Sequence, residues 1–410
     1  MNKRVAVVYP SSISWVTRCM DGVRQYAREA GGWHILSSPP AFRGVGGSLS
    51  LKEMRGWKGD GIIALIDDRR ELRTAAGIGI PVVNLGSGLP GSFGVPRVSV
   101  NHFKAGQMAA DHLLARGLSH LSFFGWKDVW YSDQRSLGFA GRAAEAGVKC
   151  GTFLRNPNTE IAKYWTRRIA EPAEWLATLP RPCGVFAVHD YMAQLLMEAC
   201  QEAQLRIPDD IALIGMDDDA SICEHSVPTL TSVSRNSERV GREAAALLDR
   251  MMQGSSSLSA DLLVDPDGVV ARQSTNKLYC SDAVVQSALD YMRAHLASQF
   301  NIECIAEHAM VSKRTLEMRF RECLQSSPHD FLTKLRVQHA QALMQLPQRR
   351  TIEQIASESG FGTAPAFYAA FQRITGKTPW RYRKDIQKIA GFPPRDGIFP
   401  ALIKKSSDVA

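Results

Sequence analysis

Short apolar runs and amphipathic stretches alternate along the first two thirds of this 410-residue chain. Residues 4–9 (RVAVVY) form a continuous β-branched run, which is typical of a buried parallel strand. Residues 14–30 have helical spacing and end at Gly31 and Gly32. The same patterns predict strands at 61–66, 81–85, 121–124, 184–188 and 211–215, and helices at 103–116, 134–146, 191–203 and 240–253. Strands and helices that alternate in this way predict a doubly wound α/β fold.

The last third of the chain contains a repeat. Apolar and capping positions between residues 302 and 328 recur fifty to fifty-one residues later, with Gly362 as the one extra residue. The matching pairs are Ile302 and Ile352, Ile305 and Ile355, Ala306 and Ala356, Ser312 and Thr363, Leu316 and Phe367, Phe320 and Phe371, Ser327 and Thr378, and Pro328 and Pro379. A repeat of this kind indicates one supersecondary unit that is used twice.

Each copy of the repeat is predicted to form two short helices around a tight turn. In the second copy, Thr351 and Gln354 have the spacing of a capping box, and Gly360 suits a left-handed helix stop. Thr363 is placed to cap the next helix, with Pro365 in its first turn, where a missing N–H does no harm. Each copy therefore predicts a helix-turn-helix, whose second helix enters a DNA major groove.

The alternative is an all-α domain made of ordinary helical hairpins, and the charge distribution argues against it. Residues 283–410 carry 18 Lys and Arg against 11 Asp and Glu, a net charge of +7. The whole chain has a net charge of +8, so the first 282 residues contribute only +1, from 31 basic and 30 acidic residues. A basic excess confined to the helical repeat is what a phosphate-binding module needs.

The repeat resembles the DNA-binding domain of AraC-type transcription regulators over about the last third of the chain. The residues that carry the resemblance are Ile355, Ala356, Gly360, Phe361, Phe367, Phe371, residues 376–379 (GKTP), Tyr382 and Arg383, with Arg336, Ala340, Leu343 and Met344 in the linking helix. Met310 and Gln325 stand where the first copy usually has glycine, so we expect both turns there to be shaped differently. Met318 and Ala369 stand where arginine is common, which puts the usual base contacts in doubt.

The predicted DNA partner is a double-stranded operator that the two second helices read from their outward faces. The candidate contacts are Lys313, Arg314, Glu317, Met318 and Arg321 in the first copy, and Tyr368, Gln372 and Arg373 in the second. Arginine can hold a guanine edge through two hydrogen bonds. The second helix offers little beyond Pro365, Tyr368, Ala369 and Gln372, so it is expected to read thymine methyls and DNA shape.

Acidic residues follow three of the predicted strands in the first domain. Asp67 follows one strand, His189 and Asp190 follow another, and residues 217–219 (DDD) follow a third. Doubly wound sheets bind ligands at the carboxyl ends of their strands. Each acidic position alone can be a helix cap or a solvated loop, and caps are the commoner case. Three in one domain favour a polar, uncharged ligand such as a sugar, whose hydroxyls and C–H faces suit carboxylates and aromatic rings.

Residues from about 4 to 275 resemble the effector-binding domain of LacI-type regulators, which is similar to periplasmic sugar-binding proteins. The markers include residues 109–113 (AADHL), 121–125 (LSFFG), 207–211 (IPDDI), 214–218 (IGMDD) and 230–233 (LTSV). The resemblance implies a two-lobed domain in which Arg135, Asp190 and Asp217 contact the effector. Trp15 and Arg18 would line the same cleft, although Trp15 can equally be core packing and a charged loop residue is more often a structural ion pair. One departure is Asn101, where aspartate is common.

Together the two resemblances imply a sugar-sensing transcription regulator. The expected parts are an effector domain at 1–275, a linker at 276–282, a DNA-binding domain at 283–390 and a poorly ordered tail at 391–410. A LacI-type sensor ahead of an AraC-type reader resembles regulators of pentose-utilisation genes, so xylose or a similar pentose is the first candidate. RNA polymerase and a second copy of the chain in a homodimer are the expected protein partners. The alternatives are another small polar effector, a purely architectural DNA binder and a sugar-processing enzyme.

Several classes of site have no signal in the sequence. The eight cysteines are scattered without a C-x-x-C pair, which predicts no metal site and a reducing cytoplasmic location. No apolar run approaches the ~20 residues of a membrane span, and the N-terminus has no signal-peptide pattern. The glycine-rich stretch at 44–47 lacks G-x-G-x-x-G spacing, and no P-loop, nucleophile elbow or H-E-x-x-H is found. We therefore expect no cofactor, no catalytic residues and no enzymatic activity.

Overall fold

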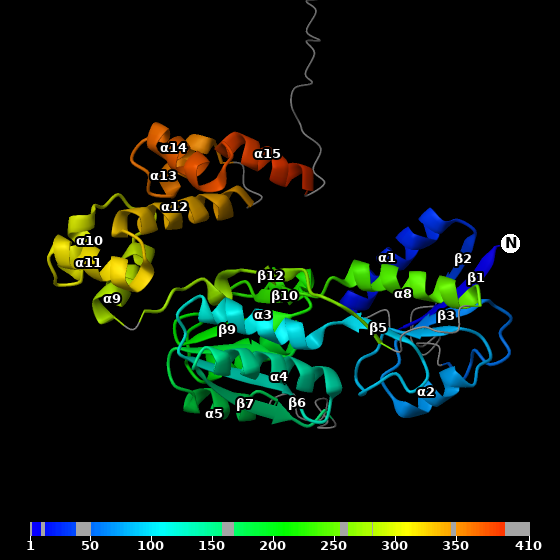
Figure 1. Cartoon of the computed structure of the whole chain (residues 1–410). Helices are drawn as coiled ribbons and strands as arrows, with labels where there is room; N and C mark the ends of the chain where they lie inside the picture. The colour runs from blue at the N-terminus through cyan, green and yellow to red at the C-terminus, as the bar shows by residue number, and fades with distance from the viewer. Residues whose placement is uncertain are drawn as a thin grey trace, which may run out of the picture. The chain divides into compact units, whose positions relative to one another are not determined.

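The structure is a computed structural model, and it describes residues 2–9, 13–37, 51–157, 168–254, 261–280, 282–345 and 350–389 (Figure 1). The chain divides into two compact units, Met1–Tyr279 (unit 1) and Cys280–Ala410 (unit 2). The glycine-rich stretch at 44–47 and the tail from residue 391, which the sequence analysis singled out, lie outside the described residues.

Unit 1 consists of two lobes, and each lobe is built on a six-stranded sheet. The sheet of the N-terminal lobe has the order β11-β5-β4-β3-β1-β2 with all pairs parallel. Its elements are β1 (Lys3–Val8), α1 (Ser14–Ala30), β2 (Trp33–Ser37), β3 (Gly61–Ala64), α2 (Arg69–Ala76), β4 (Val82–Asn84), β5 (Arg97–Val100), α8 (Ser237–Met252) and β11 (Asp261–Val264). Val5 and Val7 face α1 and α8, whereas Ala6 and Val8 pack with α2 residues on the other face. The β-branched run therefore forms a central strand that is buried on both faces.

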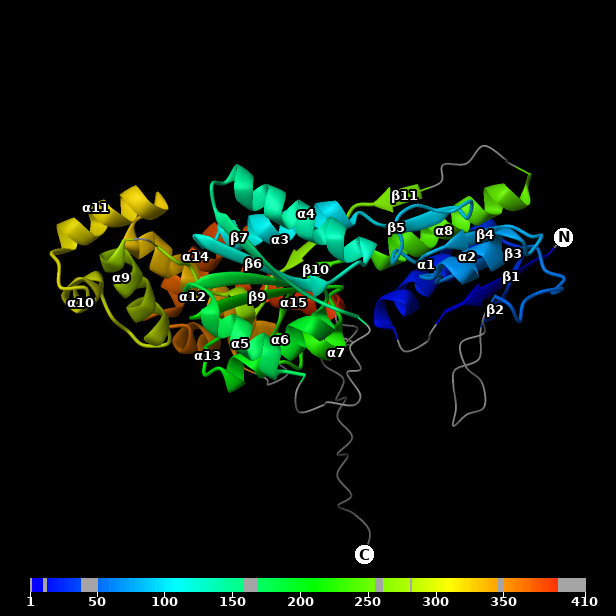
Figure 2. The same ribbon diagram turned by 90° about the horizontal axis from the view of Figure 1, so that it is seen from below.

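The C-terminal lobe of unit 1 repeats this design with the order β12-β10-β9-β8-β6-β7, where only the pairing of β12 with β10 is antiparallel. Its elements are α3 (His102–Leu114), β6 (His120–Trp126), α4 (Trp130–Glu145), β7 (Lys149–Arg155), α5 (Ala170–Thr178), β8 (Cys183–Ala187), α6 (Asp190–Glu202), β9 (Ile211–Met216), α7 (Ala220–Cys223), β10 (Thr231–Ser234) and β12 (Gly268–Val270). Figure 2 shows α3 and α4 on one face of the sheet and α5 and α6 on the other. The predicted doubly wound, two-lobed fold is confirmed.

The chain passes between the lobes three times, and hydrogen bonds hold the three crossovers together. The crossovers lie between β5 and α3, between β10 and α8, and between β11 and β12. The side-chain amide of Asn101 donates to the Asp265 carboxylate (3.0 Å), and that of Asn236 donates to the Asp265 carbonyl (3.1 Å). Asn101 also caps α3 by accepting from the Lys104 N–H (3.0 Å). An ionised aspartate at position 101 could cap the helix but could not donate to Asp265, which accounts for the amide there.

The described residues of unit 2 form helices and the turns between them, as predicted. Its helices are α9 (Ala283–Ala294), α10 (Ile302–His308), α11 (Lys313–Leu324), α12 (Pro328–Gln345), α13 (Ile352–Glu358), α14 (Ala364–Thr375) and α15 (Pro379–Ile389). The two helix-turn-helix motifs are α10–α11 and α13–α14. Thr351 and Gln354 form the predicted capping box, and Ser312 and Thr363 cap the second helix of each motif. Phe367 and Phe371 are fully buried in the core that α14 shares with α12 and α13.

The expectation that the turns of the first copy are shaped differently is wrong. Met310 and Gln325 have φ values of 53° and 50°, close to the 77° and 71° of Gly360 and Gly376 in the second copy. A left-handed conformation costs a non-glycine residue roughly 1–2 kcal/mol. The packing of Leu316, Phe320 and the rest of the motif therefore fixes the turn geometry even where the turn residue disfavours it.

The segment that joins the two units packs against unit 1 further than the predicted linker suggests. Ser274 and Thr275 are fully buried, and Tyr279 lies in the core of the C-terminal lobe with its N–H bound to the Arg116 carbonyl (2.7 Å). Unit 2 starts at Cys280, and Asp282 caps α9 and pairs with Arg319 at 3.0 Å. Asp282 is thus an integral part of unit 2.

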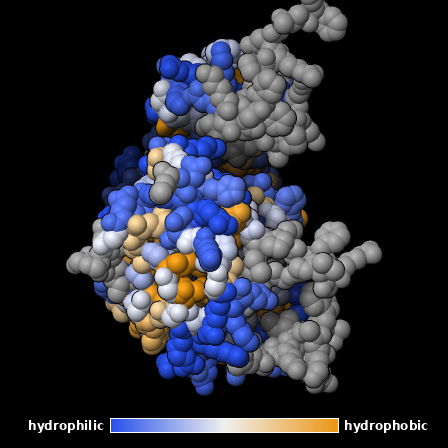
Figure 3. Space-filling model, turned by 90° about the vertical axis from the view of Figure 1, so that its right-hand side faces the viewer, coloured by the Kyte–Doolittle hydropathy of each residue, from blue (hydrophilic) through white to orange (hydrophobic). Residues whose placement is uncertain are grey.

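The surface is mostly hydrophilic on the face that Figure 3 shows, with hydrophobic residues most concentrated near the centre of the view. Exposed apolar area of this extent is normal for a folded protein. In the described ranges, no helix is both long enough and apolar enough to cross a membrane.

Candidate functional site

A cavity of about 540 Å³ lies between the two lobes of unit 1. It is lined by Ile13, Ser14, Trp15, Leu65, Asp67, Ser87, Tyr131, Arg135, His189, Asp190, Tyr191, Asp217, Asp219, Ser221, Ile222 and Arg235. Many of these residues follow the carboxyl ends of strands: β3 and β4 in one lobe, and β8, β9 and β10 in the other. The cavity therefore occupies the position at which doubly wound sheets bind ligands. Five of the six predicted effector residues line it.

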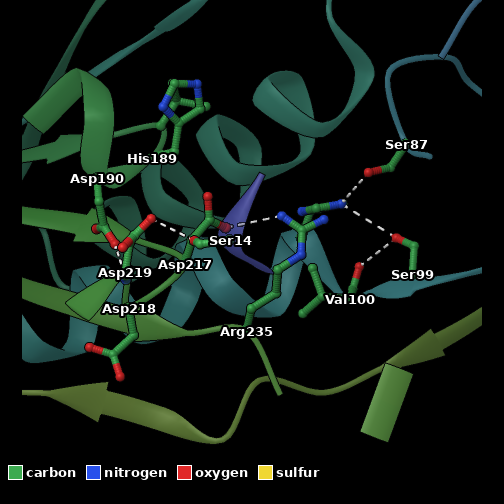
Figure 4. Close-up of polar contacts among 12 residues, drawn as sticks. Ser14, Ser87, Ser99, Val100, His189, Asp190, Asp217, Asp218, Asp219 and Arg235 are labelled. Atoms are coloured by element: carbon green, nitrogen blue, oxygen red, sulfur yellow. Dashed lines mark hydrogen bonds and ion pairs between the residues drawn. The ribbon is translucent and has the colours of Figure 1, made fainter. Parts of the chain in front are cut away.

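An aspartate held by two arginines forms the centre of the cavity. Asp217 follows β9, and its Oδ1 lies 3.0 Å from Nη1 of Arg235 (Figure 4). The same oxygen lies 3.8 Å from Nη2 of Arg135. Both arginines are almost completely buried. Burial lowers the pKa of Arg135 to about 10, and Asp217 opposes this shift, so the guanidinium stays charged at neutral pH. The arrangement is a buried ion-pair network, in which loss of one partner leaves an uncompensated charge.

Arg235 lines the cavity but was not predicted from the sequence, although its position carries a signal. Arg235 directly follows β10, so the rule that selected Asp67 and Asp217 also applies to it. The strand itself is short and half polar (TSVS), and was therefore not predicted. Tyr131, Ser87 and Ser14 also line the cavity without having been predicted.

Arg18 is not among the lining residues, and it acts on the backbone of the site instead. Its guanidinium donates to the carbonyl oxygen of Asp217. Asp217 has a φ of 110°, which side chains other than glycine rarely adopt, and its N–H is bound to the Val233 carbonyl at 3.0 Å. Contacts from two sides thus hold a strained aspartate at the centre of the cavity, as expected for a functional position.

Asp190 and its neighbour His189 point into different environments. The Asp190 carboxyl accepts from the Ser232 hydroxyl (2.6 Å) and the Asp219 N–H (2.8 Å), and its exposed fraction is 1%. Burial raises the pKa of Asp190 to about 8. His189 accepts from the Trp126 indole N–H (3.1 Å), and burial lowers its pKa to about 4. At neutral pH both side chains are therefore uncharged, and their hydrogen bonds go to different partners.

The remaining predicted residues lie at the rim and at one wall of the cavity. Asp67 is exposed, and its Oδ1 accepts from the Gly88 N–H at 2.7 Å. The Trp15 ring lies under the guanidinium of Arg235, at 3.7 Å from ring centroid to Cζ. Tyr131 lies beside Arg135 in the same way, at 5.1 Å. The cavity thus offers hydroxyls, carboxylate oxygens and aromatic rings, which suits a polyhydroxylated ligand. Within the described ranges, no group of three or more His, Cys, Asp or Glu side chains is arranged to hold a metal ion.

The predicted DNA-reading residues of unit 2 lie on the second helix of each motif. On α11, Lys313, Arg314, Met318 and Arg321 are exposed and Glu317 is half-buried. The Lys313 ammonium pairs with Glu303 at 2.8 Å.

On α14, Gln372 and Arg373 are exposed, whereas Tyr368 packs against the hydrophobic core of the motif. Arg373 lies 3.7 Å from Asp330. The two helices therefore present different surfaces: charged on α11, small and apolar around Ala369 on α14.

Comparison with known proteins identifies both parts of the chain. Residues 110–275 match the family model of the periplasmic binding protein-like domain, and residues 305–385 match that of a helix-turn-helix domain. The chain is 24% identical to the xylose operon regulatory protein of Escherichia coli (strain K12), over 93% of this chain and 96% of that protein. The xylose operon regulatory protein of Haemophilus influenzae is 25% identical over 79% of this chain and 84% of that protein.

A solved structure described as that of the xylose-binding transcription activator xylR has the same fold. It covers 93% of this chain and 98% of its own, with a TM-score of 0.65 and 23% identity. The two resemblances that the sequence carries are confirmed, in the same order along the chain.

Proposed function

We propose that this protein is a transcription regulator that binds a small uncharged sugar in the cavity of unit 1 and operator DNA through unit 2. Xylose or a similar pentose is the first candidate, because the relatives that match 79–93% of the chain are named as xylose operon regulators. The DNA-reading residues are those on the exposed faces of α11 and α14. The protein acts in the cytoplasm as a homodimer on two half-sites and contacts RNA polymerase.

The observation that carries the proposal is the Asp217 centre. The hydrogen bond from Arg235 and the shortest contact with Arg135 both involve Oδ1 of Asp217. In this proposal, Oδ2 is the acceptor for the hydroxyl groups of the sugar. A carboxylate accepts hydrogen bonds but cannot donate them, so this position suits the hydroxyl groups of a sugar. The regulators that match the chain are not enzymes by name, and an enzymatic role gains no support from the cavity.

A thermal-shift panel tests the effector half of the proposal. The full chain is heated with D-xylose, L-arabinose, D-ribose, D-glucose and the anion D-xylonate. A ligand at a hundredfold excess over its Kd adds about 2.7 kcal/mol to the free energy of unfolding, so one neutral pentose should raise the melting temperature. Stabilisation by xylonate alone, or by none of the five compounds, contradicts a neutral-pentose effector.

A DNA-binding measurement tests the other half. Genomic fragments selected by the purified chain are mapped, and their affinity is measured with and without the stabilising sugar. We expect repeated half-sites upstream of sugar-utilisation genes and an affinity that changes with the sugar. Binding that is independent of both DNA sequence and sugar would favour an architectural DNA binder.

A further inference from the structure

Two side chains at the crossovers between the lobes contact residues that line the cavity. Arg235 lies between β10 of the C-terminal lobe and α8 of the N-terminal lobe. His102 begins α3, directly after the crossover from β5. Because each residue lies at or next to a crossover, its contacts with both lobes depend on the angle between the lobes.

Arg235 contacts one lining residue from each lobe. Its Nη1 donates to Oδ1 of Asp217, in the C-terminal lobe, at 3.0 Å (Figure 4). The flat face of the same guanidinium lies 3.7 Å from the ring centroid of Trp15, on α1 of the N-terminal lobe. Only a planar group can make an in-plane hydrogen bond and a face-to-ring contact at once. Its Nε is buried without a hydrogen-bond partner among the described residues.

His102 makes a second bridge of the same kind. Its Nδ1 accepts from Nε of Arg135 in the C-terminal lobe (3.2 Å), and its Nε2 lies 2.9 Å from the hydroxyl of Ser87 in the N-terminal lobe. Because Nδ1 is the acceptor, the ring proton is on Nε2 and is donated to Ser87. Arg135 and Ser87 both line the cavity. The His102 ring has an exposed fraction of 1%, so water does not compete for these bonds.

We propose that Arg235 and His102 are positioning residues that couple occupancy of the effector site to closure of the two lobes. This inference rests on the proposed function, since it concerns the same cavity. A ligand that binds Asp217 and Arg135 fixes the orientation of the Arg235 guanidinium and of the His102 ring. In that orientation, Arg235 can contact Trp15 and His102 can contact Ser87 only when the lobes are closed. The effector thereby gains a higher affinity for the closed state, which is the condition for shifting the equilibrium.

A double-mutant cycle on Trp15 and Arg235 tests the first bridge. Arg235→Lys keeps the positive charge for Asp217 but loses the planar face, and Trp15→Leu removes the ring. D-xylose affinity is measured by calorimetry, and lobe closure by the radius of gyration in solution scattering, with and without the sugar. Each single variant should bind the sugar about five- to tenfold more weakly, and the double variant no more weakly than the worse single one. Additive losses would overturn the coupling.

Matched controls separate positioning from a loss of stability. Cζ of Arg242 lies 6.0 Å from the centroid of the Tyr26 ring, and both residues belong to the N-terminal lobe. Arg242→Lys should therefore leave sugar affinity and closure unchanged. For the second bridge, His102→Leu is compared with His112→Leu on the same helix, where the imidazole binds the Thr275 hydroxyl at 2.8 Å. Only the position 102 variant should weaken sugar binding.

The ligand-free protein gives a readout that does not depend on the sugar. Arg235→Lys should have a larger radius of gyration than the wild-type chain without any ligand, because one closing contact is lost. If the wild-type chain does not bind D-xylose but this expansion occurs, the sugar assignment fails while the bridging role stands. If the wild-type chain binds D-xylose and Arg235→Lys closes and binds equally well, the inference is wrong and the proposed function stands.

Discussion

Gly106 packs directly against the carbonyl oxygen of Arg135, so closely that a Cβ on residue 106 would stand 2.1 Å from that oxygen. On the facing helix, a Cβ on Gly138 would stand 2.0 Å from the Phe103 carbonyl oxygen. Helices α3 and α4 therefore touch backbone to backbone at two glycines. This close crossing brings His102 at the start of α3 within hydrogen-bond distance of Arg135 on α4.

Gly106→Ala should destabilise unit 1, because the backbone oxygen of Arg135 cannot move aside without parting the helices. We expect a loss of about 1–3 kcal/mol or more in the free energy of unfolding, measured in urea. Gly141→Ala on α4 is the control. Its Cβ would meet nothing within 4 Å, so higher helix propensity should stabilise the chain by roughly 0.5–1 kcal/mol. Equal stability of Gly106→Ala and the wild type would show that α3 and α4 can move apart to accommodate a methyl group at this position.

The buried Asp190 should make stability fall as pH rises. Its pKa is raised from 3.8 to about 8 in the folded chain, chiefly by burial. Between about pH 4 and 8 the unfolded chain therefore loses this proton while the folded chain keeps it, and folding becomes less favourable. The expected change is on the order of 1 kcal/mol per pH unit.

Asp190→Asn isolates this effect, since an amide does not titrate. The free energy of unfolding of the variant, relative to the wild type, should rise steadily from pH 5 to 8. The other titratable groups change the stability of both proteins equally. The test therefore uses only the difference in the free energy of unfolding between the variant and the wild type. A difference that does not change with pH would mean that Asp190 is ionised in the folded chain.

The sequence revealed the central strands and the acidic strand ends, because both are local patterns. The run at 4–9 is apolar without interruption, as a strand buried on both faces must be. Edge strands such as β7 were missed, since half-exposed residues leave no continuous apolar run. The search for acidic residues that follow predicted strands likewise selected Asp67, Asp190 and Asp217, and all three line the cavity.

What the sequence did not reveal depends on contacts between distant residues. The Asp190 carboxyl turns towards Ser232, forty-two residues away, and nothing local indicates that direction. His102 matters only because β5 ends at a crossover, which depends on which sheet β5 joins. The left-handed turn at Met310 also could not be read from a residue that disfavours it. These features are set by tertiary packing.

Unit 2 should bind DNA by itself with a steep dependence on salt. We expect a fragment of residues 280–389 to lose about tenfold or more in affinity between 50 and 200 mM salt, because the basic excess lies there. A fragment that begins at residue 283 lacks Asp282, which caps α9 and pairs with Arg319, and should be less stable by ~1 kcal/mol. Gel shifts and thermal unfolding measure the two effects. Affinity that does not change with salt would rule out phosphate contacts as the main interaction.

The two reading helices should contribute unequally to sequence preference. Arg314 is exposed on α11 and can hold a guanine edge, worth ~1–3 kcal/mol of discrimination, whereas α14 presents Gln372 beside small apolar residues. Arg314→Ala should therefore relax base preference at one position of each half-site more than Gln372→Ala does. Binding to a library of operator variants measures this. The opposite ranking would mean that α14 is the main base reader.

The sugar response should depend on Asp217, and the variant must be chosen with its backbone in mind. Asp217 has a φ of 110°, so alanine would add strain, and it would also leave Arg135 and Arg235 without their partner. Asparagine tolerates positive φ better and keeps the shape, but loses the charge. A hydrogen bond to a charged group contributes ~1.5–3 kcal/mol, so Asp217→Asn should bind the sugar roughly ten- to a hundredfold more weakly.

The same variant separates the two halves of the regulator. The residues on α11 and α14 are unchanged, so Asp217→Asn should bind DNA as the wild type does without sugar. Its DNA affinity should then stay constant at sugar concentrations that change that of the wild type, since closure is no longer favoured. Calorimetry with the sugar and gel shifts with the operator measure the two properties. A normal sugar response with lost DNA binding would make Asp217 a structural residue and remove the centre of the proposed effector site.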